Sequence, residues 1–181
     1  MNKVVVLDRD GTLIKHIPYL HDSNNVILLP GVKSGIKKLL NSNIKIYIHT
    51  NQSGINRGYF NYDDAIQCNN VMINLLEIKK SEIASVCIAP ETPDQISAYR
   101  KPSPKFGNDI ISKLGITTNE LFYIGDSICD LETANNIGCK GVGVNTGIKD
   151  LNKEIKHSNS ELLKYPVFES FTDAVLFVIN E

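Results

Sequence analysis

The chain begins with a short apolar run that ends in two acidic residues. Residues Val4 to Leu7 are uncharged and mostly β-branched, a pattern typical of a strand buried on both faces of a parallel sheet. Asp8 and Asp10 follow directly, and Gly11 lets the backbone turn sharply after them. Because the carboxyl ends of the strands form the ligand-binding edge of an open parallel sheet, the sequence predicts an acidic site at the end of a buried strand.

Two carboxylates that are two residues apart repel each other, and a divalent cation such as Mg2+ would compensate them. The alternative is a solvated acidic turn without a function. Thr12 completes a strand-Asp-x-Asp-Gly-Thr pattern within the first twelve residues, and this combination favours the metal site over the turn.

Three further segments bring polar residues to strand ends or to a loop. They are Thr50-Asn51 after an apolar strand at residues 44–49, Arg100-Lys101-Pro102 in a loop before a predicted helix, and Gly125-Asp126-Ser127 after a strand at residues 121–124, with Asp130 four residues beyond Asp126. Strand ends and loops are the positions from which an α/β protein builds a site.

Apolar periodicity predicts strands that alternate with helices. Strands are expected at residues 4–7, 44–49, 85–89, 121–124 and 141–144, with an edge strand at 167–168, and helices at residues 30–43, 61–76, 106–114, 128–137 and 171–179. Residues 145–164 are charged and weakly patterned, which indicates a surface loop with helical turns. The alternation predicts an α/β fold, a three-layer Rossmann-like parallel sheet with helices on both faces. We expect one domain over residues 1–181 and no large cap domain, because the excursions at residues 13–29 and 90–104 are too short for one.

The composition excludes several classes of function. The 181 residues carry a formal net charge of −1 and a sequence pI of about 6.4, so charge gives no support for binding to nucleic acid or to an anionic membrane. No apolar stretch has the length of a transmembrane helix, and a cleavable signal would remove Asp8. The four cysteines form no C-x-x-C pair, which favours free thiols. We therefore expect a cytoplasmic protein, and a monomer.

The order Asp-x-Asp, Thr, Lys, Gly-Asp-x-x-x-Asp resembles that of the haloacid dehalogenase superfamily of phosphohydrolases, over residues 3–150. The resemblance implies that Asp8 is the nucleophile and forms an aspartyl-phosphate. Asp10 would protonate the leaving alcohol and then activate the attacking water. Mg2+ would be held by Asp8, the backbone carbonyl of Asp10, and Asp126, with Asp130 supporting Asp126 or orienting a water. A helix N-cap is the structural alternative for Asp126.

Five residues are candidates for binding the substrate. Thr50 and the backbone of Asn51 would donate hydrogen bonds to the phosphoryl oxygens, and Lys101 would neutralise charge in the transition state. The structural alternatives are a strand-end hydroxyl for Thr50 and a solvated loop residue for Lys101. Arg57 and Arg100 are candidates for a second anionic or hydroxyl-bearing part of the substrate.

Within the superfamily, the chain is similar to the capless branch that holds histidinol phosphatase and D-glycero-D-manno-heptose 1,7-bisphosphate phosphatase. The segments that carry this likeness are Leu7 to Thr12, Tyr19, Leu29 to Val32, Thr50 to Ile55 with Arg57-Gly58, Arg100 to Pro104, and Gly125 to Ser127 with Asp130. The likeness implies Mg2+-dependent hydrolysis of a small phosphorylated metabolite. The heptose bisphosphate, a sugar bisphosphate, fits better than the alternative, histidinol phosphate.

The chain departs from this branch in one loop. The branch usually carries a structural zinc before Arg-Lys-Pro, held by Cys-x-His and Cys-x-Cys. Cys87 fits the first ligand, but Ala89 replaces the histidine, and Ser97 and Tyr99 replace the cysteine pair. One ligand of four cannot hold zinc, so we expect no structural zinc and expect Tyr99 to pack beneath the loop instead.

Two further classes of function are alternatives. A phosphotransferase or mutase would use the same aspartyl-phosphate, but mutases commonly need a larger cap. An inactive scaffold would be expected to lack Asp8, Asp10 or Lys101, and all three are present. A receiver domain also combines Asp, Thr and Lys around Mg2+, but the chain length and the Asp-x-Asp-Gly-Thr pattern exclude it.

Overall fold

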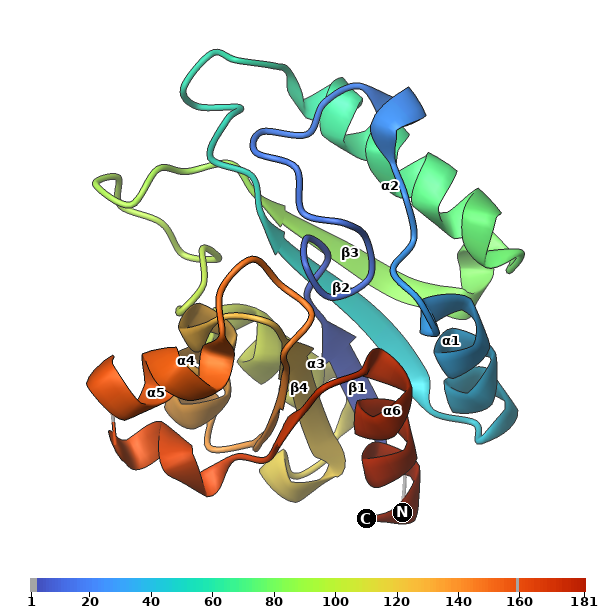
Figure 1. Cartoon of the computed structure of the whole chain (residues 1–181), viewed down its shortest axis with the longest axis vertical. Helices are drawn as coiled ribbons and strands as arrows, with labels where there is room; N and C mark the ends of the chain where they lie inside the picture. The colour runs from blue at the N-terminus through green and yellow to red at the C-terminus, as the bar shows by residue number, and fades with distance from the viewer. Residues whose placement is uncertain (1–2, 159) are drawn as a thin grey trace.

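A parallel sheet of six strands forms the centre of the structure, in the order β3-β2-β1-β4-β5-β6 (Figure 1). The computed structural model describes residues 3–158 and 160–181, and the elements are given for these residues. The strands are β1 (Val4–Leu7), β2 (Lys45–Asn51), β3 (Ile83–Ala89), β4 (Leu121–Gly125), β5 (Lys140–Val144) and β6 (Val167–Phe168). All four residues of β1 are buried, as expected for a strand in the middle of a covered sheet.

Helices cover both faces of this sheet. They are α1 (Val32–Asn41), α2 (Tyr62–Leu76), α3 (Lys105–Leu114), α4 (Ile128–Ile137), α5 (Leu151–Ser158) and α6 (Phe171–Asn180), with short 3-10 helices at Ser23–Asn25, Lys80–Glu82, Thr118–Glu120 and Ser160–Lys164. The side chains of alternate residues of β1 point to opposite faces of the sheet. Val5 and Leu7 belong to a core with α1, α2 and α6, whereas Val4 and Val6 belong to a core with α3 and α4. The predicted three-layer α/β fold is confirmed.

The register of the central strands brings distant segments to one edge. Leu7 lies opposite Ile48 of β2 on one side and Ile124 of β4 on the other. The backbone amide of Asp8 donates to the carbonyl of Ile124 at 2.9 Å. Asp8 and Asp126 therefore leave adjacent strands at nearly the same level, where the strand order of an open sheet reverses and ligands bind.

Two predicted strand ends differ from the structure. β2 continues through Thr50 and Asn51, which pair with Ile88 and Ala89 of β3, whereas the apolar pattern predicted an end at residue 49. β3 begins at Ile83, earlier than the predicted residue 85. In both places the ladder with the neighbouring strand satisfies backbone groups of polar or small residues that no apolar pattern marks.

The segment at residues 145–164 is more ordered than predicted. It contains α5 and the 3-10 helix Ser160–Lys164. Leu151, Ile155 and Leu162 are buried and form a small core with Leu131 of α4. Leu151 and Ile155 are four residues apart and share one face of α5. The sequence predicted a surface loop with helical turns; the helical turns are present, but the segment is also packed on α4, which the few apolar residues among many charged ones do not reveal.

Two excursions border the carboxyl edge of the sheet (Figure 1). In residues 13–29, Ile14 forms isolated bridges with Asp10 and Leu28. Residues 90–104 contain no helix or strand. Neither excursion builds a large cap over the sheet edge, and the rest of the described chain inserts none.

No helix within the described residues is both long enough and apolar enough to cross a membrane.

Ile155 tests the packing of α5. The side chain is 2% exposed in the core with Leu131, so Ile155→Ala should lower the free energy of unfolding by about 2–5 kcal/mol. Lys156→Ala on the exposed side of the same helix should change it by less than about 0.5 kcal/mol. Urea unfolding of both variants measures this difference. Equal small effects would mean that α5 is not packed on α4.

Candidate active site

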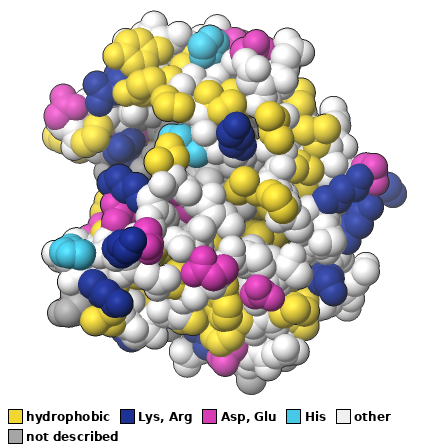
Figure 2. Space-filling model, in the orientation of Figure 1, with side chains coloured by type: hydrophobic (Ala, Val, Ile, Leu, Met, Phe, Trp, Pro, Cys, Tyr) yellow, Lys and Arg dark blue, Asp and Glu magenta, His cyan; other side chains and the backbone are white. Residues whose placement is uncertain are grey.

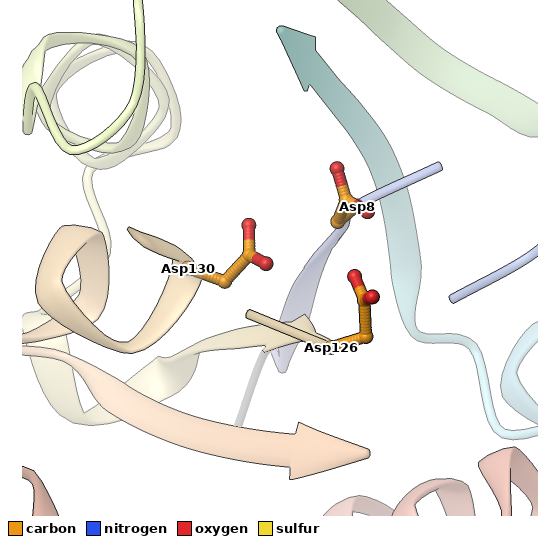
Figure 3. Close-up of side chains that lie close together, drawn as sticks. All are labelled: Asp8, Asp126 and Asp130. Carbon is orange, nitrogen blue, oxygen red and sulfur yellow. The ribbon is translucent and has the colours of Figure 1, made fainter. Parts of the chain in front are cut away.

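Three aspartates face a common space at the carboxyl edge of the sheet (Figure 3). Asp8 follows β1, Asp126 follows β4, and Asp130 lies in the first turn of α4. One carboxylate oxygen of each lies within 4.8 Å of the others. Carboxylate oxygens are the hard ligands that Mg2+ requires. The sequence predicted that Asp8 and Asp126 meet, with Asp130 supporting Asp126 or orienting a water, and in the structure the three carboxylates form one cluster.

Burial and mutual repulsion disfavour the charged forms of these acids. Desolvation raises the pKa of Asp8 and of Asp126, and the neighbouring carboxylates raise both further. The ammonium of Lys101 opposes this effect, since its Nζ lies 2.5 Å from Asp8 Oδ1 and 2.6 Å from Asp130 Oδ1. One lysine does not compensate three acids, so the donor set fits an additional divalent cation.

Asp130 also caps α4. Its Oδ2 accepts hydrogen bonds from the backbone amide of Ser127 at 3.1 Å and from the Ser127 hydroxyl at 2.6 Å. Ser127 and Asp130 together form a capping box at the start of the helix. The cap that the sequence offered as an alternative for Asp126 is therefore made by these two residues, which leaves the Asp126 carboxylate in the cluster with Asp8.

The loop that carries Lys101 is held by the end of β2. The side-chain carbonyl of Asn51 accepts from the Lys101 amide at 3.0 Å, and its NH2 group donates to the Lys101 carbonyl at 3.2 Å. His49 Nε2 lies 2.7 Å from the backbone carbonyl of Tyr99. These bonds fix the backbone on both sides of Arg100. The sequence predicted a role for the Asn51 backbone but not this bracing by its side chain.

Asp10 is oriented by four donors. The buried Arg9 side chain donates to the Asp10 carboxylate from Nε at 2.9 Å and from Nη2 at 3.2 Å, and it also donates from Nη1 to Asn69 at 2.9 Å. Gln52 and Thr50 donate to Asp10 Oδ2 at 3.0 and 3.2 Å. A two-pronged guanidinium contact fixes the plane of a carboxylate. The Thr50 hydroxyl, expected to contact phosphate, here contacts Asp10.

The loop after β5 closes over Asp126. The Thr146 hydroxyl donates to the Gly11 carbonyl at 2.6 Å, and this bond joins the loop to the turn after β1 (Figure 1). A Cβ atom at Gly11 or at Gly147 would overlap the Asp126 carboxylate. Glycine is therefore required on both sides of this carboxylate, and Gly11 also has a positive φ of 88°.

A pocket of about 410 Å3 lies at this edge of the sheet. Its lining consists of Asp8, Asp10, His16, Thr50, Asn51, Lys101, Asp126, Ser127, Cys129, Ile148, Lys149 and Glu154. Acidic and basic side chains gather on the left of the view in Figure 2, the side on which α5 lies in Figure 1. The pocket brings together candidates for a nucleophile, an acid-base group, a cation and metal ligands, and such a set is suited to phosphoryl transfer.

The two predicted arginines lie outside this lining. Arg57 is exposed, and it only adds to the lowering of the pKa of Asp94, which is due mainly to a hydrogen bond from the Thr92 side chain. Arg100 donates to the Glu91 carbonyl at 2.8 Å and lines an adjacent pocket of about 360 Å3 with Lys101 and Cys129. Arg100 therefore borders the site, whereas Arg57 does not line its pocket.

The loop that differs from the zinc-binding pattern packs differently from the prediction. Tyr99 does not lie beneath it: the ring is partly exposed, its hydroxyl donates to Asp109 of α3 at 2.9 Å, and Lys105 lies 5.2 Å from the ring centre. Cys87 is half-buried in β3. Among the described residues, the only group of three potential metal ligands is the one with Asp8, and Cys87 is outside it.

The chain is similar in sequence and in structure to known phosphatases. A family model for HAD-hydrolase-like proteins matches residues 98–174. The D-glycero-beta-D-manno-heptose-1,7-bisphosphate 7-phosphatase of Pseudomonas aeruginosa is 30% identical over 145 residues, which are 80% of this chain and 82% of that protein. The chain belongs to the haloacid dehalogenase-like phosphatase family. The enzyme of the same name from Neisseria meningitidis serogroup A is 27% identical over 181 residues, 99% of this chain and 96% of that one.

A solved structure of the family has nearly the same extent. The D,D-heptose 1,7-bisphosphate phosphatase of B. bronchiseptica, in complex with magnesium and phosphate, has a TM-score of 0.86 and 26% identity, and the match covers 98% of each chain. The resemblance that the motifs indicated is confirmed, and the chain is a phosphatase of this family.

Sequence reasoning missed several residues around this phosphatase site. Arg9 had no assigned role, although an arginine between two buried-strand acids is expected to pair with one of them. Thr146, Gly147 and Lys149 were missed as well. The signal for them was their position directly after an apolar strand, β5, at the same edge of the sheet as Asp8.

His49 must stay neutral in the folded phosphatase. The Tyr99 carbonyl can only accept, so Nε2 carries the proton, and Nδ1 accepts from the Tyr123 hydroxyl. Burial and the nearby Lys101 charge lower the pKa of His49 from 6.5 to about 3.

The stability of the phosphatase should therefore depend on His49 in acid. Below its ordinary pKa the unfolded chain binds a proton that the folded chain does not, so stability is lost as the pH falls from about 6 to about 4. His49 should contribute about 1.4 kcal/mol per pH unit to this loss. Urea unfolding at several pH values should give a shallower slope for His49→Gln, whose side chain does not titrate. Identical slopes for both proteins would contradict a neutral buried His49.

Proposed function

We propose that this chain hydrolyses the 7-phosphate of D-glycero-D-manno-heptose 1,7-bisphosphate through an aspartyl-phosphate on Asp8. One observation supports the proposal most strongly. Asp8, Asp10 and Lys101 line the same pocket, and the chain is similar over nearly its whole length to phosphatases that are named for this substrate. Histidinol phosphate is the alternative substrate that the sequence motifs left open.

In the first step Asp8 attacks the phosphorus. A bond forms between an Asp8 carboxylate oxygen and phosphorus, and the bond from phosphorus to the C7 oxygen breaks. Asp10 gives its proton to the departing alkoxide, so the product leaves as a neutral alcohol. The contacts of Arg9 and Gln52 with Asp10 hold its carboxylate at the mouth of the pocket during this transfer.

In the second step water attacks the aspartyl-phosphate. Asp10, now a carboxylate, takes a proton from this water, the new bond forms between water oxygen and phosphorus, and the bond to Asp8 breaks. Inorganic phosphate leaves, and both aspartates return to their starting state. Lys101, already ion-paired to Asp8, lies where it would stabilise the charge on the phosphoryl oxygens.

Asp8, Asp126 and the backbone carbonyl of Asp10 would hold Mg2+. When bound, the ion would neutralise the repulsion within the acidic cluster and the charge of the transferred phosphoryl group. Asp130 would act through Lys101, since its carboxylate accepts from that ammonium at 2.6 Å. A small-molecule substrate suits the open edge of the sheet, because no large cap encloses the pocket.

Asp8→Asn should abolish turnover, because an amide cannot form the acyl phosphate. Asp10→Asn should lower kcat by about 10²–10⁴-fold, the usual contribution of a general acid-base group. Phosphate release from the heptose bisphosphate and from histidinol phosphate measures both effects. Asp63→Asn, at an exposed acid in the first turn of α2, is the matched control.

The proposal also predicts which substrate is preferred, with a higher kcat/KM for the heptose bisphosphate. Substantial activity in Asp8→Asn would refute the proposed nucleophile, provided that thermal melting shows a folded protein. A clear preference for histidinol phosphate would refute the proposed substrate and leave the nucleophile intact.

Metal dependence has two independent readouts. Chelation with EDTA should remove activity, and Mg2+ but not Ca2+ should restore it, because Ca2+ tolerates bidentate carboxylates that would occupy both oxygens of Asp8. Mg2+ should also raise the Tm by relieving the repulsion between Asp8 and Asp126. Asp126→Asn should reduce that rise. Elemental analysis should find no stoichiometric zinc, and full activity after metal stripping would contradict the assigned role of Asp126.

A further inference from the structure

A second lysine borders the catalytic pocket, from the loop between β5 and α5. Lys149 lines the pocket together with Asp8 and Asp126. Its side chain is 73% exposed and forms an ion pair of 2.7 Å with Glu154, another lining residue. Lys101, by contrast, is only 4% exposed and is already shared by Asp8 and Asp130. Of the two lysines among the described lining residues, Lys149 is therefore the one whose ammonium can change partners.

The backbone that presents Lys149 is fixed. Thr146 is bonded to Gly11, and Gly147 packs against the Asp126 carboxylate. The side chain of Asn145 accepts from the Leu151 amide at 3.0 Å and donates to Glu169. A rigid loop thus ends in a flexible, charged side chain at the edge of the pocket.

We propose that Lys149 binds the phosphate group that the enzyme does not hydrolyse. To bind it, the Lys149 ammonium breaks its ion pair with Glu154. This inference rests on the proposed function, because it requires a substrate with a second phosphate. A phosphate dianion that enters a pocket lined by Asp8, Asp10, Asp126 and Glu154 is repelled unless a cation meets it. An ammonium on a four-carbon stem binds phosphate as a mobile point charge.

The arginines expected for this task are less well positioned. Arg57 does not line the pocket, and the Arg100 guanidinium is bonded to the Glu91 carbonyl in the adjacent pocket. The loop with Lys149 instead contacts both the turn after β1 and Asp126. It therefore links recognition of the distal phosphate to the centre where the chemistry takes place.

Two substrates that differ only in the distal phosphate test this inference. Heptose 1,7-bisphosphate and heptose 7-phosphate share the reacting group, and the ratio of their kcat/KM values isolates the contribution of the 1-phosphate. Lys149→Ala should lower this ratio about fivefold, mainly through KM for the bisphosphate, as expected for a solvent-exposed charge pair. The matched control is Lys153→Ala, at a lysine of the adjoining helix α5 that is 77% exposed, pairs with Asp150 and is not a lining residue.

Glu154→Gln tests the exchange of partners. It should raise the ratio more in the wild-type background than in the Lys149→Ala background, where only the repulsion by Glu154 is lost, and a double-mutant cycle measures this difference. Added salt should lower the ratio more for the wild type than for Lys149→Ala, because exposed charges are screened.

The outcomes separate this inference from the proposed function. The inference is supported if the ratio of kcat/KM values for bisphosphate and monophosphate falls in Lys149→Ala but not in Lys153→Ala. The inference about Lys149 is refuted if the ratio is unchanged in Lys149→Ala or falls equally in Lys153→Ala. In that case the proposed hydrolysis through Asp8 still stands. Absence of Asp8-dependent hydrolysis of both substrates overturns the proposed function and this inference together.

Discussion

Three carboxylates and one lysine lie together where β1 and β4 end, with Asp8, Asp130 and Lys101 buried and Asp126 partly buried, and much of the surrounding structure keeps them there. A carboxylate that leaves water is destabilised unless opposite charge and hydrogen bonds replace its hydration. Lys101 supplies charge to Asp8 and Asp130, while Asn51 braces the backbone that carries it. Burial, together with the repulsion that remains, raises the pKa of Asp8 and Asp126. A divalent cation bound by these carboxylates would relieve that repulsion, and it would in turn attract a phosphate dianion.

The topology explains how distant segments supply this site. With β1 between β2 and β4, the residues after three strands meet at one edge, although Asp8 and Asp126 are far apart in the chain. The loop after β5 joins them through the bond from Thr146 to Gly11. The sheet therefore sets where these residues leave the backbone, and contacts such as those of Arg9 and Gln52 with Asp10 then set the orientation of the side chains.

The sequence predicts the features that depend on local signals. Apolar runs mark buried strands, and polar residues at their ends mark the binding edge, so the fold and the meeting of Asp8, Asp126 and Lys101 follow from patterns only a few residues long. It does not predict the bracing of Lys101 by the Asn51 side chain or the hold of Gln52 on Asp10. Those bonds join residues 50 and 42 positions apart, and no local pattern encodes their direction.

Long charged side chains are the hardest to assign for a related reason. Arg100 and Lys101 are neighbours, yet Lys101 enters the catalytic pocket, whereas the Arg100 guanidinium bonds to Glu91 next to it. Which of two adjacent side chains enters a pocket depends on the backbone path, which for this loop is fixed by partners on β2. Asp8 and Asp126 directly follow apolar strands, where the sequence is most informative. Lys101 and Lys149 stand on loops, where the sequence says least about which pocket a side chain enters.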